Sequence, residues 1–154
     1  MPEPCGSLVT ERELASSTAI ALEQDGKHVS YSFGKFSMAE CSCFGLSWFV
    51  WEPIKGKNIG WLRLKTTSKV LSVKPDGRTL CLKPKDSHVF SKNQLWSLYG
   101  NPGSTKIRSQ QMENGQHLYL HVDHRGYVGL TTDQKNLQMK PMLQSWRIKQ
   151  GTNK

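Results

Sequence analysis

Short stretches in which apolar and polar residues alternate recur along the chain, and each runs into a turn that contains glycine. The three clearest cover residues 20–26, 71–77 and 118–126. Alternation is typical of a strand with one buried face, and Asp-Gly favours a tight reversal because glycine tolerates positive φ. Further strand candidates follow about every eight to twelve residues. The pattern predicts an all-β chain, a barrel or a sandwich.

Tryptophans divide the chain at nearly equal intervals. Trp48, Trp96 and Trp146 are 48 and 50 residues apart, and each is followed two residues later by an aliphatic residue. The later two also carry a glutamine two residues before, Gln94 and Gln144, which the first copy lacks. A fixed period of this size indicates one supersecondary unit repeated three times. Chance spacing among the five tryptophans is the alternative interpretation.

The length of 154 residues suits one domain with a sizeable core. We therefore predict a single domain over 1–154, with repeats at approximately 8–52, 53–100 and 101–150 and a tail at 151–154.

Composition excludes several classes of protein. No apolar run approaches the length of a membrane span, and the N-terminal residues show no secretory signal, so we expect a cytoplasmic protein. The four cysteines, Cys5, Cys41, Cys43 and Cys81, are expected to be reduced. Half a metal site at Cys41 and Cys43 is the weaker alternative, because no second Cys/His pair has zinc spacing. We expect no metal and no cofactor.

Charge is unevenly distributed along the chain. The net charge of +9 divides into −4 over 1–52, +8 over 53–92 and +5 over 93–154. The basic second repeat predicts a positive face for an anionic partner, although lysine on a solvated strand surface is an equally simple explanation. The predicted patch consists of Arg63, Lys65, Lys74, Arg78, Lys83, Lys85 and Lys92.

Aromatic residues in this basic region are few. Trp61 alternates with Leu62 and Leu64, so Trp61 faces outward if the leucines face inward. It would then be exposed on the basic side or cover a barrel end. Nucleic-acid binding is not expected, because base stacking needs several exposed aromatic rings and the region offers only Trp61 and Phe90.

No catalytic motif is present. The chain has no Gly-x-Ser-x-Gly, no glycine-rich phosphate loop and no His-Glu-x-x-His. His117, Tyr119, His121 and Asp123 share one face if the apolar residues between them point inward, and a solvated strand is favoured there over a metal site. We therefore expect a non-catalytic protein.

Three copies of about 50 residues, each with a glycine turn before the tryptophan, resemble the β-trefoil of the ricin B-chain lectin family. The second copy is most similar, through Asp76-Gly77 and 93–98, and the first is degenerate. The resemblance implies that Trp48, Trp96 and Trp146 are equivalent core residues around a pseudo-threefold axis. It also implies that the glutamines at 94 and 144 tie adjacent loops.

The same resemblance implies where a sugar would bind. The family's sugar-binding Asp corresponds to Ala21, Ser72 and Tyr119, none of which is acidic. Asn93 retains the family's Asn, and Asp76 at the turn is the alternative carboxylate. One residual site in the second repeat, at Ser72, Asp76 and Asn93, is what remains of the family pattern.

The favoured hypothesis is a β-trefoil interaction module, monomeric as an isolated domain, whose basic second repeat binds an acidic protein or a cytoskeletal surface. A lectin domain with one residual glycan site in the second repeat is the alternative. Binding of an anionic glycan or a phosphoinositide is a further alternative.

Overall fold

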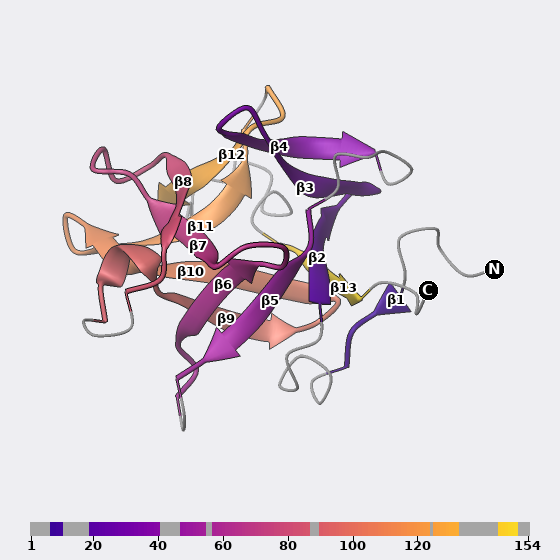
Figure 1. Cartoon of the computed structure of the whole chain (residues 1–154), viewed down its shortest axis with the longest axis horizontal. Helices are drawn as coiled ribbons and strands as arrows, with labels where there is room; N and C mark the ends of the chain where they lie inside the picture. Colours follow the sequence, from indigo (N-terminus) through magenta and orange to yellow (C-terminus); the bar gives the residue numbers. More distant parts are fainter. Residues whose placement is uncertain are drawn as a thin grey trace.

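Antiparallel strands form nearly all of the regular structure (Figure 1). The computed structural model describes residues 7–10, 19–40, 47–54, 57–86, 90–123, 125–132 and 145–150. In this part of the chain no helix has the length and apolar character that a membrane crossing needs.

The second repeat shows the basic unit. Its four strands are β6 (Gly60–Leu64), β7 (Lys69–Val73), β8 (Leu80–Pro84) and β9 (Trp96–Asn101), with the 3₁₀ helix η1 (Lys92–Gln94) before the last strand. Strands β7 and β8 form a hairpin, and β6 pairs with both β7 and β9.

The third repeat has the same order. Its strands are β10 (Ser104–Glu113), β11 (Gln116–Val122), β12 (Val128–Thr132) and β13 (Arg147–Gln150). The hairpin of β11 and β12 corresponds to that of β7 and β8.

The first repeat contains β2 (Ala19–Gln24), β3 (Lys27–Ser32), β4 (Lys35–Glu40) and β5 (Phe49–Pro53). A short additional strand, β1 (Ser7–Leu8), pairs with β13.

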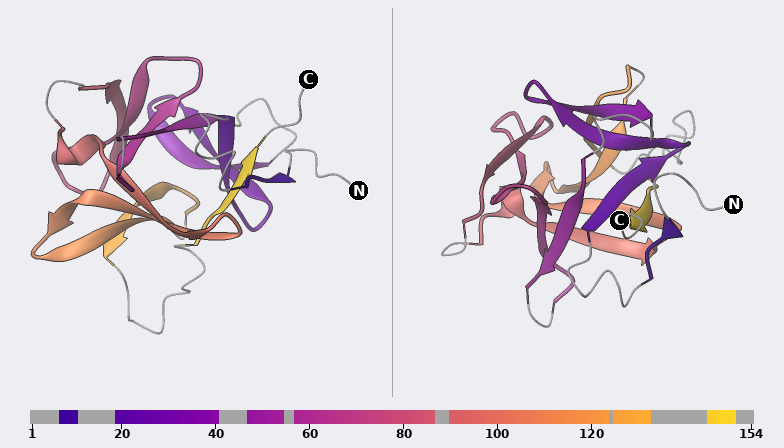
Figure 2. Two further views of the ribbon diagram at one scale, coloured as in Figure 1. Left: turned by 90° about the horizontal axis from the view of Figure 1, so that it is seen from below. Right: turned by 45° about the vertical axis from the view of Figure 1, so that its right-hand side comes forward.

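The first and fourth strands of the three repeats form a ring. Along the ring, β2 pairs with β5, β5 with β6, β6 with β9 and β9 with β10, and β13 pairs with β2. The link between β10 and β13 is a bridge at Thr105 and Trp146, whose backbone N–H and C=O groups exchange two hydrogen bonds of 2.8 Å. The second and third strands form three hairpins, and their strands β4, β8 and β12 lie together on one side of the ring (Figures 1 and 2). The all-β class and the β-trefoil fold predicted from the sequence are confirmed.

Two of the three predicted tryptophans occupy equivalent core positions. Trp96 and Trp146 are both fully buried. The indole Nε1–H of Trp96 donates to the carbonyl of Leu71 at 3.0 Å, and that of Trp146 donates to the carbonyl of Leu120 at 3.1 Å. A buried indole N–H needs such a partner, and both acceptors lie on the second strand of their own repeat.

The prediction that Trp48 is the third equivalent residue is wrong by one position. Phe49 pairs with Ile20 in the ring and is fully buried, whereas Trp48 is only half-buried. Phenylalanine has no N–H to donate, and the corresponding carbonyl, that of Val29, instead accepts the backbone N–H of Ser47 at 3.1 Å. A different donor therefore satisfies the same acceptor in the degenerate repeat.

The glutamine before the tryptophan ties two segments together in the second repeat. Oε1 of Gln94 accepts the N–H of Asp86 at 3.0 Å, and its Nε2 donates to the carbonyl of Pro84 at 2.9 Å. Ser47 has the same offset from Phe49, and its hydroxyl accepts the N–H of Tyr31. Gln144 lies outside the described residues.

The first repeat was also misaligned at its glycine turn. Asp25-Gly26 joins β2 to β3, whereas Asp76-Gly77 joins β7 to β8. The structural equivalent of Asp76-Gly77 is Phe33-Gly34, between β3 and β4. The sequence alignment therefore placed the first repeat one hairpin too early.

Trp61 is buried, so of the two predicted roles the exposed contact on the basic side is wrong. Leu62 points into the main core as predicted, but Trp61 packs with Val70 and Leu95 in a second apolar cluster on the outer side of the ring. The ammonium of Lys85 lies 4.5 Å from the indole centroid and shields it from water. Trp61 therefore covers the ring rather than offering a contact surface.

Candidate functional site

A groove of about 420 Å³ lies between the β7–β8 turn and η1 of the second repeat, and Gln111 of β10 in the third repeat also lines it. It brings Asn93 of the predicted site together with lysines of the predicted patch. Its lining consists of Val73, Lys74, Pro75, Lys83, Lys92, Asn93 and Gln111.

The β7–β8 turn that forms one wall is held by Asp76. Its Oδ1 accepts the backbone N–H groups of Arg78 at 2.9 Å and Thr79 at 2.8 Å, and its Oδ2 accepts the Thr79 hydroxyl. These hydrogen bonds, the Thr79 hydroxyl foremost, lower the pKa of the Asp76 carboxyl group. Asp76 therefore caps the turn and does not line the groove.

Ser72 does not reach the surface. Its side chain is fully buried, and its hydroxyl donates to the carbonyl of Val70 at 3.0 Å. Of the residues predicted for the residual sugar site, only Asn93 lines the groove.

The strand positions equivalent to Ser72 also differ from the predicted ones. The hairpin registers pair Ser72 with Cys81, and the matching positions in the other repeats are Ser30 and His121, not Ala21 and Tyr119. None of the three is a carboxylate, so the acidic residue of the family pattern is missing under the corrected alignment as well.

The charge of the groove is positive. Lys74, Lys83 and Lys92 line it, and none of the described residues that line it is acidic. Lys65 is the remaining member of the predicted patch that forms no ion pair with a described residue. It is exposed and lies outside the groove. Three ammonium groups around one concave surface attract an anion in a way that scattered surface lysines do not.

The other patch residues are engaged elsewhere. Glu52 accepts Arg63 Nε at 2.8 Å and Lys85 Nζ at 3.1 Å. Burial raises the pKa of Glu52, but the hydrogen bonds from these two cations outweigh it and leave the pKa lowered. Arg78 forms an ion pair with Glu113. The seven predicted residues are therefore not one continuous cationic surface.

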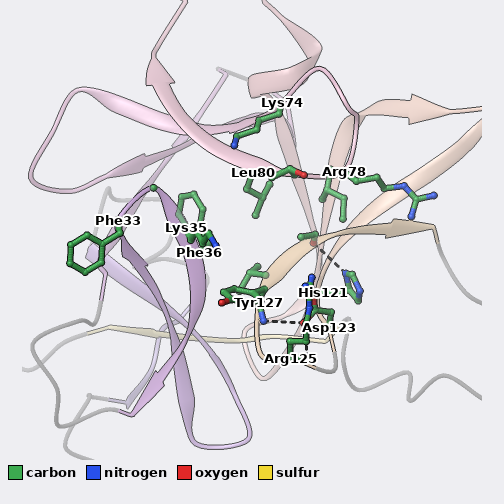
Figure 3. Close-up of a pocket in the computed structure, with 15 residues that line it drawn as sticks. Phe33, Lys35, Phe36, Lys74, Arg78, Leu80, His121, Asp123, Arg125 and Tyr127 are labelled. Atoms are coloured by element: carbon green, nitrogen blue, oxygen red, sulfur yellow. Dashed lines mark hydrogen bonds and ion pairs between the residues drawn. The ribbon is translucent and has the colours of Figure 1, made fainter.

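A larger cavity of about 590 Å³ was missed by the sequence analysis (Figure 3). It lies where the ends of the three hairpins meet, and its lining includes Phe36, Leu80 and Val128, one from each repeat. No sequence motif predicted it, because its lining residues come from three repeats that are far apart in the chain.

In the part of the chain that the structure describes, histidine and acidic residues do not gather into a metal site. Among the described residues, no group of three His, Cys, Asp or Glu side chains is placed to hold a metal ion. Leu118, Leu120 and Val122 point inward as expected, while His121 is partly buried and its Nδ1 lies 3.4 Å from the carbonyl of Gly129.

No protein-family model and no curated protein sequence matches the chain. Several solved structures do match the chain. A GH43 β-1,3-galactosidase matches with a TM-score of 0.71 and 18% identity, over 92% of this chain and 28% of that chain. The Polyporus squamosus lectin, bound to the epitope Neu5Acα2-6Galβ1-4GlcNAc, matches with a TM-score of 0.63 and 13% identity, over 87% of this chain and 49% of that one.

The β-trefoil lectin of the Vibrio vulnificus hemolysin/cytolysin, with N-acetyl-D-lactosamine bound, matches with a TM-score of 0.57 and 15% identity. That match covers 91% of this chain and 99% of the lectin. The chain spans less than a third of the galactosidase and about half of the Polyporus lectin. These likenesses establish the fold, a β-trefoil of the kind that lectins also have.

Proposed function

We propose that the chain is a non-catalytic carbohydrate-binding module and that the groove of the second repeat binds an acidic glycan. The observation that carries the proposal is the combination of the Asn93 amide with three lysines in one concave surface, where the described lining residues include no carboxylate. An amide both donates to and accepts from sugar hydroxyls, and ammonium groups form strong hydrogen bonds to a carboxylate or sulfate.

The solved structures support the carbohydrate part of the proposal. Two of them are lectins with a glycan bound, and the epitope on the Polyporus lectin begins with Neu5Ac, a sugar acid. Their low identity transfers only the fold, so the ligand class for this chain depends on its own groove.

The aspartates at the hairpin turns have structural partners. Oxygens of Asp76 accept backbone N–H groups of its own turn, and Asp123 does the same for Arg125 and Tyr127. The proposal therefore assigns both carboxylates to stabilising their turns.

An acidic protein or cytoskeletal partner is less well supported. The comparisons with solved structures do not support such a partner. Part of the predicted patch lines the groove, and part is engaged in two sets of ion pairs. A groove of this size fits a few sugar rings better than a flat protein surface.

A glycan array with neutral, sialylated and sulfated members tests the proposal. We expect signal on acidic members, lost in Asn93→Ala and in Lys83→Gln combined with Lys92→Gln. Gln116→Ala is the matched control, because Gln116 is an exposed amide outside the groove. An array blank for the wild-type protein, or signal unchanged by Asn93→Ala and the lysine pair, would contradict the proposal. Phosphoinositide liposomes in parallel identify a lipid headgroup as the competing ligand.

A further inference from the structure

The cavity at the hairpin ends lies on the pseudo-threefold axis. Phe36, Leu80 and Val128 occupy the same position in their hairpins, opposite Tyr31, Val73 and Val122 respectively. All three are buried and form an apolar base.

Unequal turn lengths explain why a cavity remains at this place. Two residues separate β3 from β4, whereas six separate β7 from β8 and five separate β11 from β12. The hairpins are joined by Met38 N–H to Gly126 C=O and Leu130 N–H to Arg78 C=O, both at 3.0 Å. The corresponding bond from Leu82 is not among the backbone hydrogen bonds of the described residues. The short first-repeat turn thus leaves the centre open, and the cavity measures about 590 Å³.

Cations predominate in the cavity lining. Among the described lining residues, Lys35, Lys74 and Arg125 contribute positive charge, against the carboxylate of Asp123. Arg78 also lines the cavity, but its guanidinium is paired with Glu113. The Asp123 carboxylate is already bound by the Arg125 guanidinium at 3.2 Å and by two backbone N–H groups. The free space therefore carries a net positive potential.

An aromatic ring stands among these cations. Tyr127 is 38% exposed, and Lys35 Nζ and the Arg125 guanidinium lie 5.5 and 5.2 Å from its ring centroid (Figure 3). Aromatic rings pack against the C–H face of sugars and similar polyols through apolar contact. The cavity thus offers an apolar ring surface and cations side by side.

Phe33 lies at the rim of the cavity. Its side chain is 100% exposed, and its backbone has φ of 51°, a region unfavourable for a bulky residue. Figure 3 shows the ring pointing away from Tyr127 and Arg125, so the backbone strain belongs to the two-residue turn and the ring is not part of the site.

We propose that this axial cavity is a second binding site, separate from the groove, for a polyol ring that carries sulfate or phosphate groups. The anionic groups face Lys35, Lys74 and Arg125, and the ring lies against Tyr127. The proposal rests on the cavity's own charges and does not require the groove to bind anything.

Two probes test it: a sulfated disaccharide released from heparin, and inositol hexakisphosphate. Each is titrated into isotope-labelled protein by NMR and calorimetry, with lactose as the neutral comparison. We expect chemical-shift changes at Tyr127 and Gly129, and about tenfold or greater weakening in Lys35→Gln combined with Arg125→Gln. Tyr127→Phe keeps the ring and is expected to retain binding, whereas Tyr127→Ala is expected to lose it. The probe that binds more tightly identifies sulfate or phosphate as the natural group.

Lys57→Gln is the matched control, because Lys57 is exposed and lines neither cavity. Near-ultraviolet circular dichroism establishes that each variant is folded, and Lys35→Gln alone replaces the double variant if Arg125→Gln disturbs the turn. Shift changes confined to Asn93 and Lys83, unchanged affinity in the folded Lys35 variants, or no binding of either probe would overturn the axial site. The first of these results would still support the groove.

Discussion

At the scale of single residues, one backbone carbonyl in each repeat requires a donor. The indoles of Trp96 and Trp146 supply it twice, and the backbone N–H of Ser47 supplies it once. Phe49 can replace tryptophan in the core because its hydrogen bond has been taken over by a neighbour. Sequence reasoning selects tryptophan by its type, so it chose Trp48 and could not recognise an adjacent phenylalanine as the equivalent residue.

This assignment predicts unequal costs for the same substitution. Trp96→Phe leaves the buried carbonyl of Leu71 without its donor, and we expect a loss of about 1–3 kcal/mol in the free energy of unfolding. Trp48→Phe should cost clearly less, because Trp48 is half-buried and lies outside the core cluster. Urea unfolding followed by fluorescence measures both. Equal losses would contradict the assignment of Phe49 as the core residue.

A second residue-scale prediction concerns acid. His28 is 2% exposed, faces Glu23 across the β2–β3 pair, and Lys149 Nζ lies 3.9 Å from that carboxylate. Burial lowers the pKa of His28 below its ordinary value of 6.5. As pH falls through that value the unfolded chain binds a proton that the folded chain does not, so stability decreases.

We expect the free energy of unfolding to fall between about pH 7 and pH 5, and His28→Asn to flatten this decline. Denaturant titrations at several pH values measure it. His117→Asn is the comparison, because His117 is exposed. An identical pH slope in His28→Asn and the wild-type protein would show that His28 is not responsible.

At the scale of elements, the residues at the turns determined which hairpins could be predicted from the sequence and which could not. Asp25-Gly26 and Asn114-Gly115 have the residues that two-residue hairpin turns prefer, and both form such turns. Phe33-Gly34 forms the same kind of turn without the preferred first residue. The alternating pattern therefore indicated the strands, but the strongest turn signal led the first repeat to be aligned on the wrong hairpin.

Phe33→Asn should accordingly stabilise the protein. Asparagine tolerates the left-handed conformation that phenylalanine adopts at a cost, and no buried contact is lost, so we expect a gain of about 1 kcal/mol. The melting temperature measures it, with Phe33→Leu as the comparison that keeps a bulky residue at the left-handed position. An unchanged or lower melting temperature for Phe33→Asn would mean that the Phe33 side chain does stabilise the fold.

At the scale of the whole molecule, the repeats determine where ligands can bind. Except for Gln111 of β10, the described residues that line the groove come from the second repeat, so Asn93 and its lysines could be predicted from the sequence. The axial cavity needs three hairpins, and its outline depends on turn lengths that alternation does not reveal. Lys74 is the residue shared by both linings.

Lys74→Gln is therefore expected to weaken anion binding at both places, whereas Lys92→Gln affects the groove alone. The loss at each site should be several-fold and should shrink as salt is raised, because added ions screen exposed charges. NMR titration with the sulfated disaccharide resolves the two sites separately. If Lys74→Gln weakened anion binding at one site only, the Lys74 ammonium would contribute to binding at that site alone.

The carbohydrate proposal is tested most directly by calorimetry with a sialylated lactose and with lactose itself, each at low and at raised salt. We expect the sialylated sugar to bind more tightly and its advantage to decline with salt, because the lysines of the groove recognise the carboxylate. Equal affinity for the two sugars, or no binding of either, would contradict it.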